Sequence, residues 1–93
     1  LVYSENNSFK IPRSETFNVI GLIYLDLNKY ELSIANFNES LKIRRQANDI
    51  KGIGGSLNNI GLVHYYKNDY ESAIEFFKKS LKWLILIRTI GSN

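Results

Sequence analysis

An internal repeat with a period of 40 limits this chain to a small number of folds. When residues 15–53 are aligned with residues 55–93, thirteen of the 39 pairs are identical. The identities involve many residue types, so a biased composition does not explain them. They are Asn18/Asn58, Ile20/Ile60, Gly21/Gly61, Leu22/Leu62, Asn28/Asn68, Tyr30/Tyr70, Glu31/Glu71, Ile34/Ile74, Phe37/Phe77, Ser40/Ser80, Leu41/Leu81, Lys42/Lys82 and Ile50/Ile90. Such a period is typical of arrays of stacked structural units.

Each unit is predicted to be a helix, a short turn and a second helix. Phe17, Ile20, Gly21 and Tyr24 recur at the spacing of one helical face, and the second unit repeats the pattern. Asn28 stands at the turn, as its counterpart does downstream, because asparagine tolerates the left-handed conformation that ends many helices. We therefore expect an all-α fold of tandem antiparallel helix hairpins. The expected helices cover about residues 14–27, 30–48, 54–67 and 70–88.

Small and large residues alternate where the two helices of a unit would meet. Gly21 and Gly61 have no side chain, so a neighbouring helix can approach closely at these positions, although glycine costs about 1 kcal/mol of helix propensity. Serine or alanine occupies the other narrow positions, and aromatic rings would fill the remaining space. The narrow positions are Ser33/Ala73 and Ser40/Ser80, and the rings are Tyr24, Tyr30, Phe37, Tyr70 and Phe77.

This arrangement resembles the tetratricopeptide repeat (TPR). The matching residues are Phe17, Ile20-Gly21, Tyr24, Ser33, Phe37 and Ser40 in the first unit, and Leu57, Ile60-Gly61, His64, Ala73, Phe77 and Ser80 in the second. The period of 40 is longer than usual for the family and resembles the subgroup found in kinesin light chains and bacterial signalling proteins. The resemblance implies an α-solenoid fragment, with one repeat over residues 14–53 and another over 54–93. Residues 1–13 would form a leader or the end of a preceding helix.

Catalysis and metal binding have little support in the sequence, so we expect no enzyme, no cofactor and no metal site. The chain has no cysteine and a single histidine, His64, which stands where the repeat places a buried aromatic residue and is expected to be packed and hydrogen-bonded. Glu31 and Glu71 fit the first turn of each second helix, where a carboxylate interacts favourably with the helix dipole. The glycines of 52–55 lack the following lysine of a phosphate-binding loop and are predicted to form a flexible turn between the repeats.

Charge and hydropathy limit the classes of partner. The net charge of +3 is mild, and the longest apolar run, from Trp83 to Ile87, is five residues, far short of the roughly 20 that span a bilayer. Basic residues cluster on the two predicted second helices, which form the outer, convex wall of TPR arrays. They are Lys42, Arg44 and Arg45, and Lys78, Lys79 and Lys82. We interpret them as a solvated face and expect neither a membrane nor a nucleic acid as partner.

In TPR proteins the first helices line a concave groove that holds a peptide or a partner helix. The residues that the resemblance assigns to this groove are Glu15, Asn18, Leu22, Leu25 and Asp26 in the first unit, and Gly55, Asn58, Asn59, Leu62, Tyr65 and Tyr66 in the second. An asparagine side chain carries both a donor and an acceptor, so it can pair with a peptide backbone. The alternative is that the asparagines join neighbouring helices. The lysine and arginine pattern that clamps a terminal carboxylate is absent from these positions.

The end of the last predicted helix suggests self-association. The residues after Leu81 are apolar on all sides of the helix, in contrast to the polar residues after Leu41, and such a helix is normally buried. We expect a homo-oligomer in which residues 81–90 pack against or exchange with a second copy, through Trp83, Leu84, Leu86 and Ile87. The competing account is that a further repeat of a longer protein covers this surface.

The function expected from these patterns is that of a cytoplasmic protein-interaction module, a fragment of a larger scaffold. The alternative is a regulatory or sensor segment of a signalling enzyme whose catalytic domain lies outside this chain. The cysteine content does not decide the cellular compartment. The sequence of the flanking parts of the gene would separate the two roles.

Overall fold

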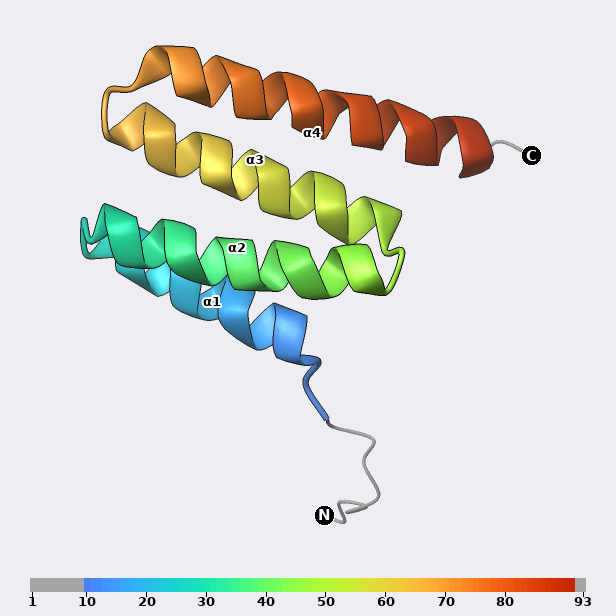
Figure 1. Ribbon diagram of the computed structural model, residues 1–93, viewed down its shortest axis with the longest axis horizontal. Coiled ribbons are helices and arrows are strands. Elements are labelled where there is room, and N and C mark those ends of the chain that lie inside the picture. The colour runs from blue at the N-terminus through green and yellow to red at the C-terminus, as the bar shows by residue number, and fades with distance from the viewer. Residues whose placement is uncertain (1–9, 92–93) are drawn as a thin grey trace.

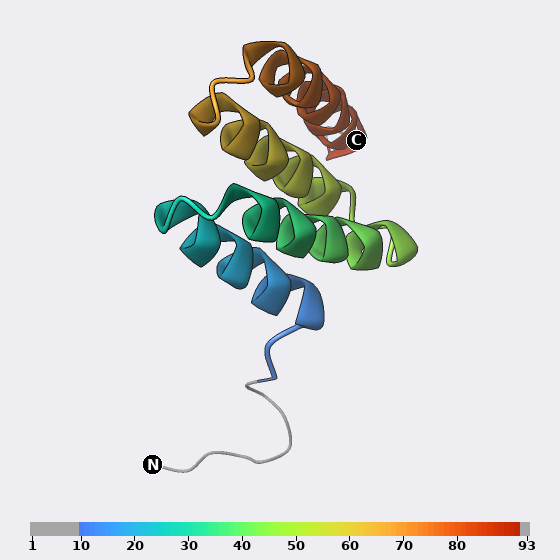
Figure 2. The same cartoon turned by 60° about the vertical axis from the view of Figure 1, so that its left-hand side comes forward.

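The part of the chain that the structure describes folds into four helices that stack in chain order (Figures 1 and 2). The computed structural model describes residues 10–91, and this part of the chain contains no strand. The helices are α1 (Arg13–Asp26), α2 (Tyr30–Gln46), α3 (Ile50–Tyr66) and α4 (Tyr70–Gly91). Consecutive helices run antiparallel, which confirms the predicted all-α fold of tandem helix hairpins.

An asparagine in the left-handed conformation follows each of the first three helices. The φ angles of Asn28, Asn48 and Asn68 are 61°, 55° and 69°. The backbone N–H of each donates to the carbonyl three residues earlier, as in the 3.0 Å bond from Asn28 to Leu25. Asparagine adopts this conformation at lower cost than most residues, so it ends the helix where glycine otherwise would. The predicted role of Asn28 and Asn68 is confirmed.

The predicted flexible turn at Gly52-Ile53-Gly54-Gly55 is wrong. All four residues lie in α3, which begins at Ile50 rather than near residue 54, and no glycine in the described chain has a positive φ. Asn48 already reverses the chain, so no second break is needed. Gly54 instead permits close packing, because Ser80 Oγ of α4 donates to its carbonyl at 2.7 Å and the Leu84 side chain occupies the space next to its Cα.

The boundaries of the predicted repeats differ from the boundaries of the two hairpins in the structure. The predicted border between residues 53 and 54 lies inside α3, so the hairpins span 13–46 and 50–91. Most of the predicted leader, residues 1–9, lies outside the described residues, as do residues 92–93. Pro12 immediately precedes α1, and its carbonyl accepts bonds from the N–H groups of Glu15 and Thr16. A proline is tolerated here because the first N–H groups of a helix have no partner within it.

The core lies between α2 and α3 and extends into both hairpins. Its buried apolar side chains are Phe37, Leu41, Ile53, Leu57, Ile60 and Val63. Within each hairpin a glycine faces a phenylalanine ring, and a β-carbon on Gly21 would lie only 2.7 Å from the Phe37 ring. Ser33 Oγ donates to the Gly21 carbonyl at 2.7 Å, so this narrow position is also fixed by a buried hydrogen bond. The predicted pairing of a small residue with a large ring is confirmed for Gly21/Phe37 and Gly61/Phe77, whereas Tyr70, also predicted to fill this space, is 54% exposed.

Two glycine-to-alanine variants should have opposite effects on the free energy of unfolding. Gly21→Ala places a methyl group against the Phe37 ring, which is fully buried and cannot move aside. We expect a loss of about 1–3 kcal/mol from this overpacking, which outweighs the gain in helix propensity. Gly55→Ala is the matched control, because no atom lies within 4 Å of the position that its methyl group would take. It should stabilise the helix by about 0.5–1 kcal/mol. Urea unfolding followed by circular dichroism measures both changes, and equal signs would contradict the packing argument.

The second helix of the second hairpin, α4, is less covered than its counterpart α2. Leu81 of α4 is exposed although its counterpart in α2, Leu41, is buried, and the pair Ile74 and Ile34 shows the same trend. The reason is positional: α2 lies between α1 and α3, whereas among the described residues α4 packs only against α3 (Figure 2).

Candidate protein-binding groove

A hydrogen bond between two predicted groove residues links the first helices of the two hairpins. Asn59 Nδ2 of α3 donates to Asn18 Oδ1 of α1 at 2.8 Å, and both side chains are half-buried. The alternative interpretation, that asparagines join neighbouring helices, therefore holds for this pair. Asn58 differs from them because it is exposed on the surface of α3.

An open hollow of about 610 Å³ lies along α1 and reaches the end of α3. Its lining residues are Val19, Leu22, Ile23, Leu25, Asp26, Asn28 and Tyr66. The structure thus brings together Leu22, Leu25, Asp26 and Tyr66 of the predicted set. The volume falls within the range of about 300–1,000 Å³ typical of binding pockets. The lining carries one carboxylate and no cation, so it is suited to apolar groups and hydrogen-bond donors rather than to an anionic ligand.

Three residues of this hollow are missing from the predicted groove: Val19, Ile23 and Asn28. A signal for two of them, Val19 and Ile23, is present in the sequence. Val19, Leu22, Ile23 and Asp26 recur at the spacing of a single helical face, opposite the one that packs on α2. The sequence pattern marks Asn28 only as a turn residue, and the structure shows that the turn also closes one end of the hollow.

Three tyrosines form an exposed aromatic cluster beside the α3–α4 turn. The ring centroids of Tyr65 and Tyr66 are 5.3 Å apart, and those of Tyr65 and Tyr70 are 5.6 Å apart, both in edge-to-face geometry. This arrangement is favoured by the quadrupoles of aromatic rings and holds the side chains in place while they stay accessible. The hydroxyl of Tyr70 donates to Asn68 Oδ1 at 3.0 Å. Of the remaining predicted residues, Leu62 and Gly55 are half-buried on α3 and Glu15 is exposed on α1.

The comparison with protein families agrees with this geometry. A family model described as tetratricopeptide repeat matches residues 12–83. The chain belongs to the tetratricopeptide repeat family. No curated protein and no solved structure gives a significant match to it. TPR units mediate protein–protein interaction in general and are typically not catalytic, so the hollow and the tyrosine cluster belong to a fold whose repeats generally bind proteins.

His64 takes the place of a tyrosine in the TPR pattern and packs as predicted. Its ring stacks on that of Phe76, with centroids 5.4 Å apart and an angle of 10° between the planes. The predicted hydrogen bond is not formed, because Nδ1 lies 3.6 Å from Oδ2 of Asp69. Asp69 stands at the start of α4, where hydrogen bonds from Ser72 lower the pKa of its carboxyl group. The Asp69 carboxylate therefore accepts a hydrogen bond from the Ser72 N–H at the start of α4.

The predicted position of Arg44 on the solvated convex face is wrong. Its side chain is only 11% exposed and reaches from α2 toward the other hairpin. Nη1 donates to Ser56 Oγ at 2.9 Å and to the Gly52 carbonyl at 3.3 Å, while Nη2 donates to Glu15 Oε1 at 3.1 Å. A guanidinium group has five N–H donors, so this one side chain of α2 can bond to both α1 and α3. Arg44 is a structural link between the two TPR units.

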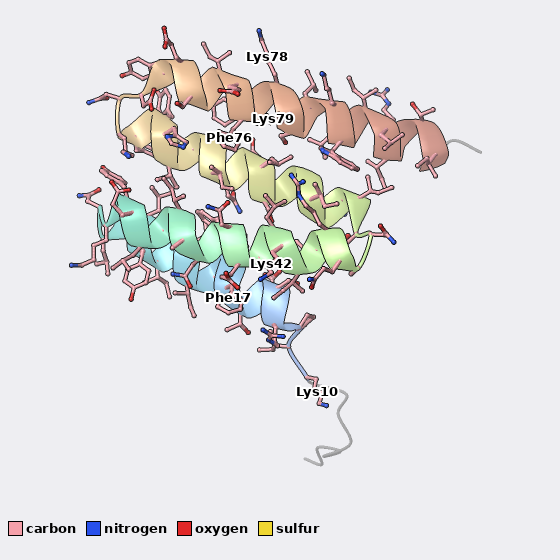
Figure 3. The ribbon with its side chains drawn as sticks, viewed as in Figure 1. Lys10, Phe17, Lys42, Phe76, Lys78 and Lys79 are labelled. Atoms are coloured by element: carbon pink, nitrogen blue, oxygen red, sulfur yellow. The ribbon has the colours of Figure 1, made fainter. Side chains whose placement is uncertain are left out.

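The other basic residues of the two predicted clusters of this TPR protein are exposed, as predicted (Figure 3). Lys42 and Arg45 lie on α2, whereas Lys78, Lys79 and Lys82 lie on α4, and α3 separates these helices (Figure 1). Lys79 is engaged locally, because its Nζ lies 4.9 Å from the centroid of the Phe76 ring and 3.8 Å from Oε2 of Glu75. The two small clusters do not form one continuous basic stripe.

Metal-binding and membrane-spanning features are absent from residues 10–91. This part of the chain holds no group of three or more histidine, aspartate or glutamate residues placed to bind a metal ion. None of its helices is both long enough and apolar enough to cross a bilayer.

The four residues predicted for self-association differ in their surroundings. Trp83 packs against the core, and Ile87 is half-buried. Leu84 leans on Gly54 of α3 but is as exposed as Leu86. They are distributed around α4 and do not form one continuous face.

Proposed function

We propose that this TPR protein binds a peptide or a partner helix along α1 and α3. The observation that carries the proposal is the hollow in which Leu22, Leu25 and Tyr66 come together from two different helices. The bond between Asn18 and Asn59 supports it, because this bond fixes the spacing of the two helices that would hold the ligand.

The ligand chemistry follows from the residues that stay accessible. Leu22 and Val19 offer apolar contact, and Asp26 can accept hydrogen bonds from a donor or pair with a cation. Tyr65 and Tyr66 provide broad aromatic faces with hydroxyl groups, a combination enriched at protein interfaces. Asn58 can pair with a peptide backbone. A segment with apolar side chains next to a lysine or arginine would match this surface.

The groove proposal can be tested with peptides selected from a random phage-displayed library on the immobilised chain. We expect the double variant Leu22→Ala/Tyr66→Ala, at two exposed residues that line the hollow, to lower the affinity of a selected peptide at least tenfold, a loss of about 1.4 kcal/mol. Fluorescence anisotropy with the labelled peptide measures this change. Lys42→Ala, on the exposed face of α2, is the control and should bind like the original chain. Equal affinities for all three proteins would place the peptide elsewhere. Asn59 is left unchanged, because its loss would disturb the contact with Asn18.

The broader role that we propose is that of a scaffold fragment, in the cytoplasm, from the long-period TPR subgroup similar to kinesin light chains and bacterial signalling proteins. The turns at Asn28 and Asn68, which occupy equivalent positions of the two units and share one backbone conformation, support the long period. A sensor segment of a signalling enzyme would present the same groove, and the flanking gene sequence separates the two roles.

A second proposed property is self-association through the end of α4. The support is the exposed apolar surface of this helix, where Leu84 and Leu86 are each more than two-fifths exposed. Burying one such side chain contributes roughly 1.5–3 kcal/mol, so several together favour association with a second copy.

A further inference from the structure

The contact between the two hairpins shows how one repeat unit packs against the next. We call the packing of α2 on α3 the inner junction. Ile34 and Leu41 of α2 belong to the same core as Ile60 and Val63 of α3. Polar bonds hold its two ends: Arg44 binds Ser56, and Lys67 Nζ lies 3.4 Å from Glu31 Oε2.

The α3 side of the inner junction has an apolar counterpart on α1. Ser56, Ile60, Val63 and Lys67 follow one face of α3, and the alignment of the two units places Thr16, Ile20, Ile23 and Leu27 on the same face of the first unit. We call Ile20, Ile23 and Leu27 the α1 end face. Val63 is 0% exposed, whereas Ile23 is 52% exposed, because no described helix lies on this side of α1.

The α2 side of the inner junction has its counterpart on α4. The same alignment pairs Tyr30, Ile34 and Leu41 with Tyr70, Ile74 and Leu81, to which Ile85 adds a further turn of the same face. We call Tyr70, Ile74, Leu81 and Ile85 the α4 end face. Leu41 is 9% exposed and Leu81 is 56% exposed, although the residue type is the same.

The polar links of the inner junction are replaced by apolar residues at both ends of the molecule. The counterpart of Lys67 is Leu27 on α1, and the counterpart of Arg44 is Leu84 on α4. The α1 end face is therefore more apolar than the α3 side of the inner junction, and its exposure to water is correspondingly more costly. On α4, Leu84 lies beside the α4 end face and leans on Gly54 of α3.

We propose that the α4 end face of one copy binds the α1 end face of a second copy, in the manner of the inner junction. The inference deepens the proposed self-association and rests on it, but it names a different acceptor: α1 rather than a second α4. Both faces have the helical spacing of surfaces that already pack together within the chain, so their shapes are suited to each other. Such a head-to-tail contact leaves one face free at each end and gives a series of oligomers instead of a closed dimer.

Two single variants, each with one face blocked, test this arrangement. Ile23→Glu places a charge on the α1 end face, and Leu81→Glu places one on the α4 end face. Both positions are exposed, so the hairpins should keep their helical circular dichroism spectrum. In sedimentation velocity at tens of micromolar, the mean mass of the assemblies formed by the unmodified chain should rise with concentration and exceed twice the monomer mass of 10.7 kDa. Each variant alone should stay monomeric. Their equimolar mixture should form a heterodimer and stop there, because only one pair of intact faces remains.

The control variant is Leu32→Glu, which changes an exposed leucine of α2 outside both end faces. It should associate like the unmodified chain. A monomeric unmodified chain would overturn both the self-association and the head-to-tail contact. If Leu81→Glu is monomeric while Ile23→Glu still dimerises, α4 pairs with α4; self-association then stands and the head-to-tail contact is wrong. Folded variants whose mixture stays monomeric would also overturn it.

Discussion

Replacing Phe37 with alanine is expected to remove most of the stability of this chain. The ring is fully buried and lies against Gly21, which has no side chain to fill the space that the ring would vacate. Losses of about 3–5 kcal/mol are typical for such a change, and they grow with the cavity that remains. A domain of this size has a total stability of only about 5–15 kcal/mol, so a large fraction of the variant should unfold at physiological temperature.

The repeat supplies a matched control for this prediction. Phe77 occupies the same position in the second unit and faces Gly61 in the same way, but its ring is only half-buried. Phe77→Ala should therefore cost clearly less than Phe37→Ala. Urea unfolding with the fluorescence of Trp83 as the signal gives both free energies. Equal losses would show that burial by the neighbouring hairpin contributes little to the stability of α2.

Arg44→Ala is expected to weaken the contact between the two TPR units. The variant removes the donors that serve Ser56 Oγ and the Gly52 carbonyl, and it also removes the buried aliphatic part of the side chain. Hydrogen bonds that involve a charged group contribute about 1.5–3 kcal/mol, so we expect a loss of about 2–3 kcal/mol. The loss is measured by thermal or urea unfolding, and hydrogen exchange should speed up first at the start of α3.

Glu15→Ala separates the ion pair from the buried bonds of Arg44. Glu15 is 50% exposed, and ion pairs of this kind contribute less than about 1 kcal/mol because water screens them. A small effect of Glu15→Ala beside a large effect of Arg44→Ala would support the structural role of the contacts with α3. Similar losses for the two variants would assign that role to the ion pair and contradict the prediction.

Many residues of the candidate site can be predicted from the local sequence, but which of them lie together in the structure cannot. The helical spacing places Leu22, Leu25 and Tyr66 on the first helices, and the structure shows them around one hollow. Val19 and Ile23 also line the hollow, but they are not among the groove positions that the resemblance to the family assigns. The pairing of Asn18 with Asn59 rather than Asn58 depends on how α1 and α3 are rotated against each other. That rotation is set by packing, and no local pattern records it.

The number of helices, their antiparallel order and the turns between them follow from the sequence alone. Helical periodicity and the left-handed preference of asparagine act between residues that are close along the chain, so they are visible without the fold. The small residues opposite large rings are also readable, because both members of each pair recur with the same period.

Which of the equivalent residues are buried depends on the way the helices pack. Leu41 and Leu81 are the same residue at the same position of the repeat, yet one lies in the core and the other on the surface. Arg44 belongs to a run of basic residues and is nevertheless nearly buried, while the glycines of 52–55 continue a helix instead of breaking it. The physical reason is that burial depends on the helix lying across from a residue, and α2 has a neighbour on both sides whereas α4 contacts only α3 among the described residues.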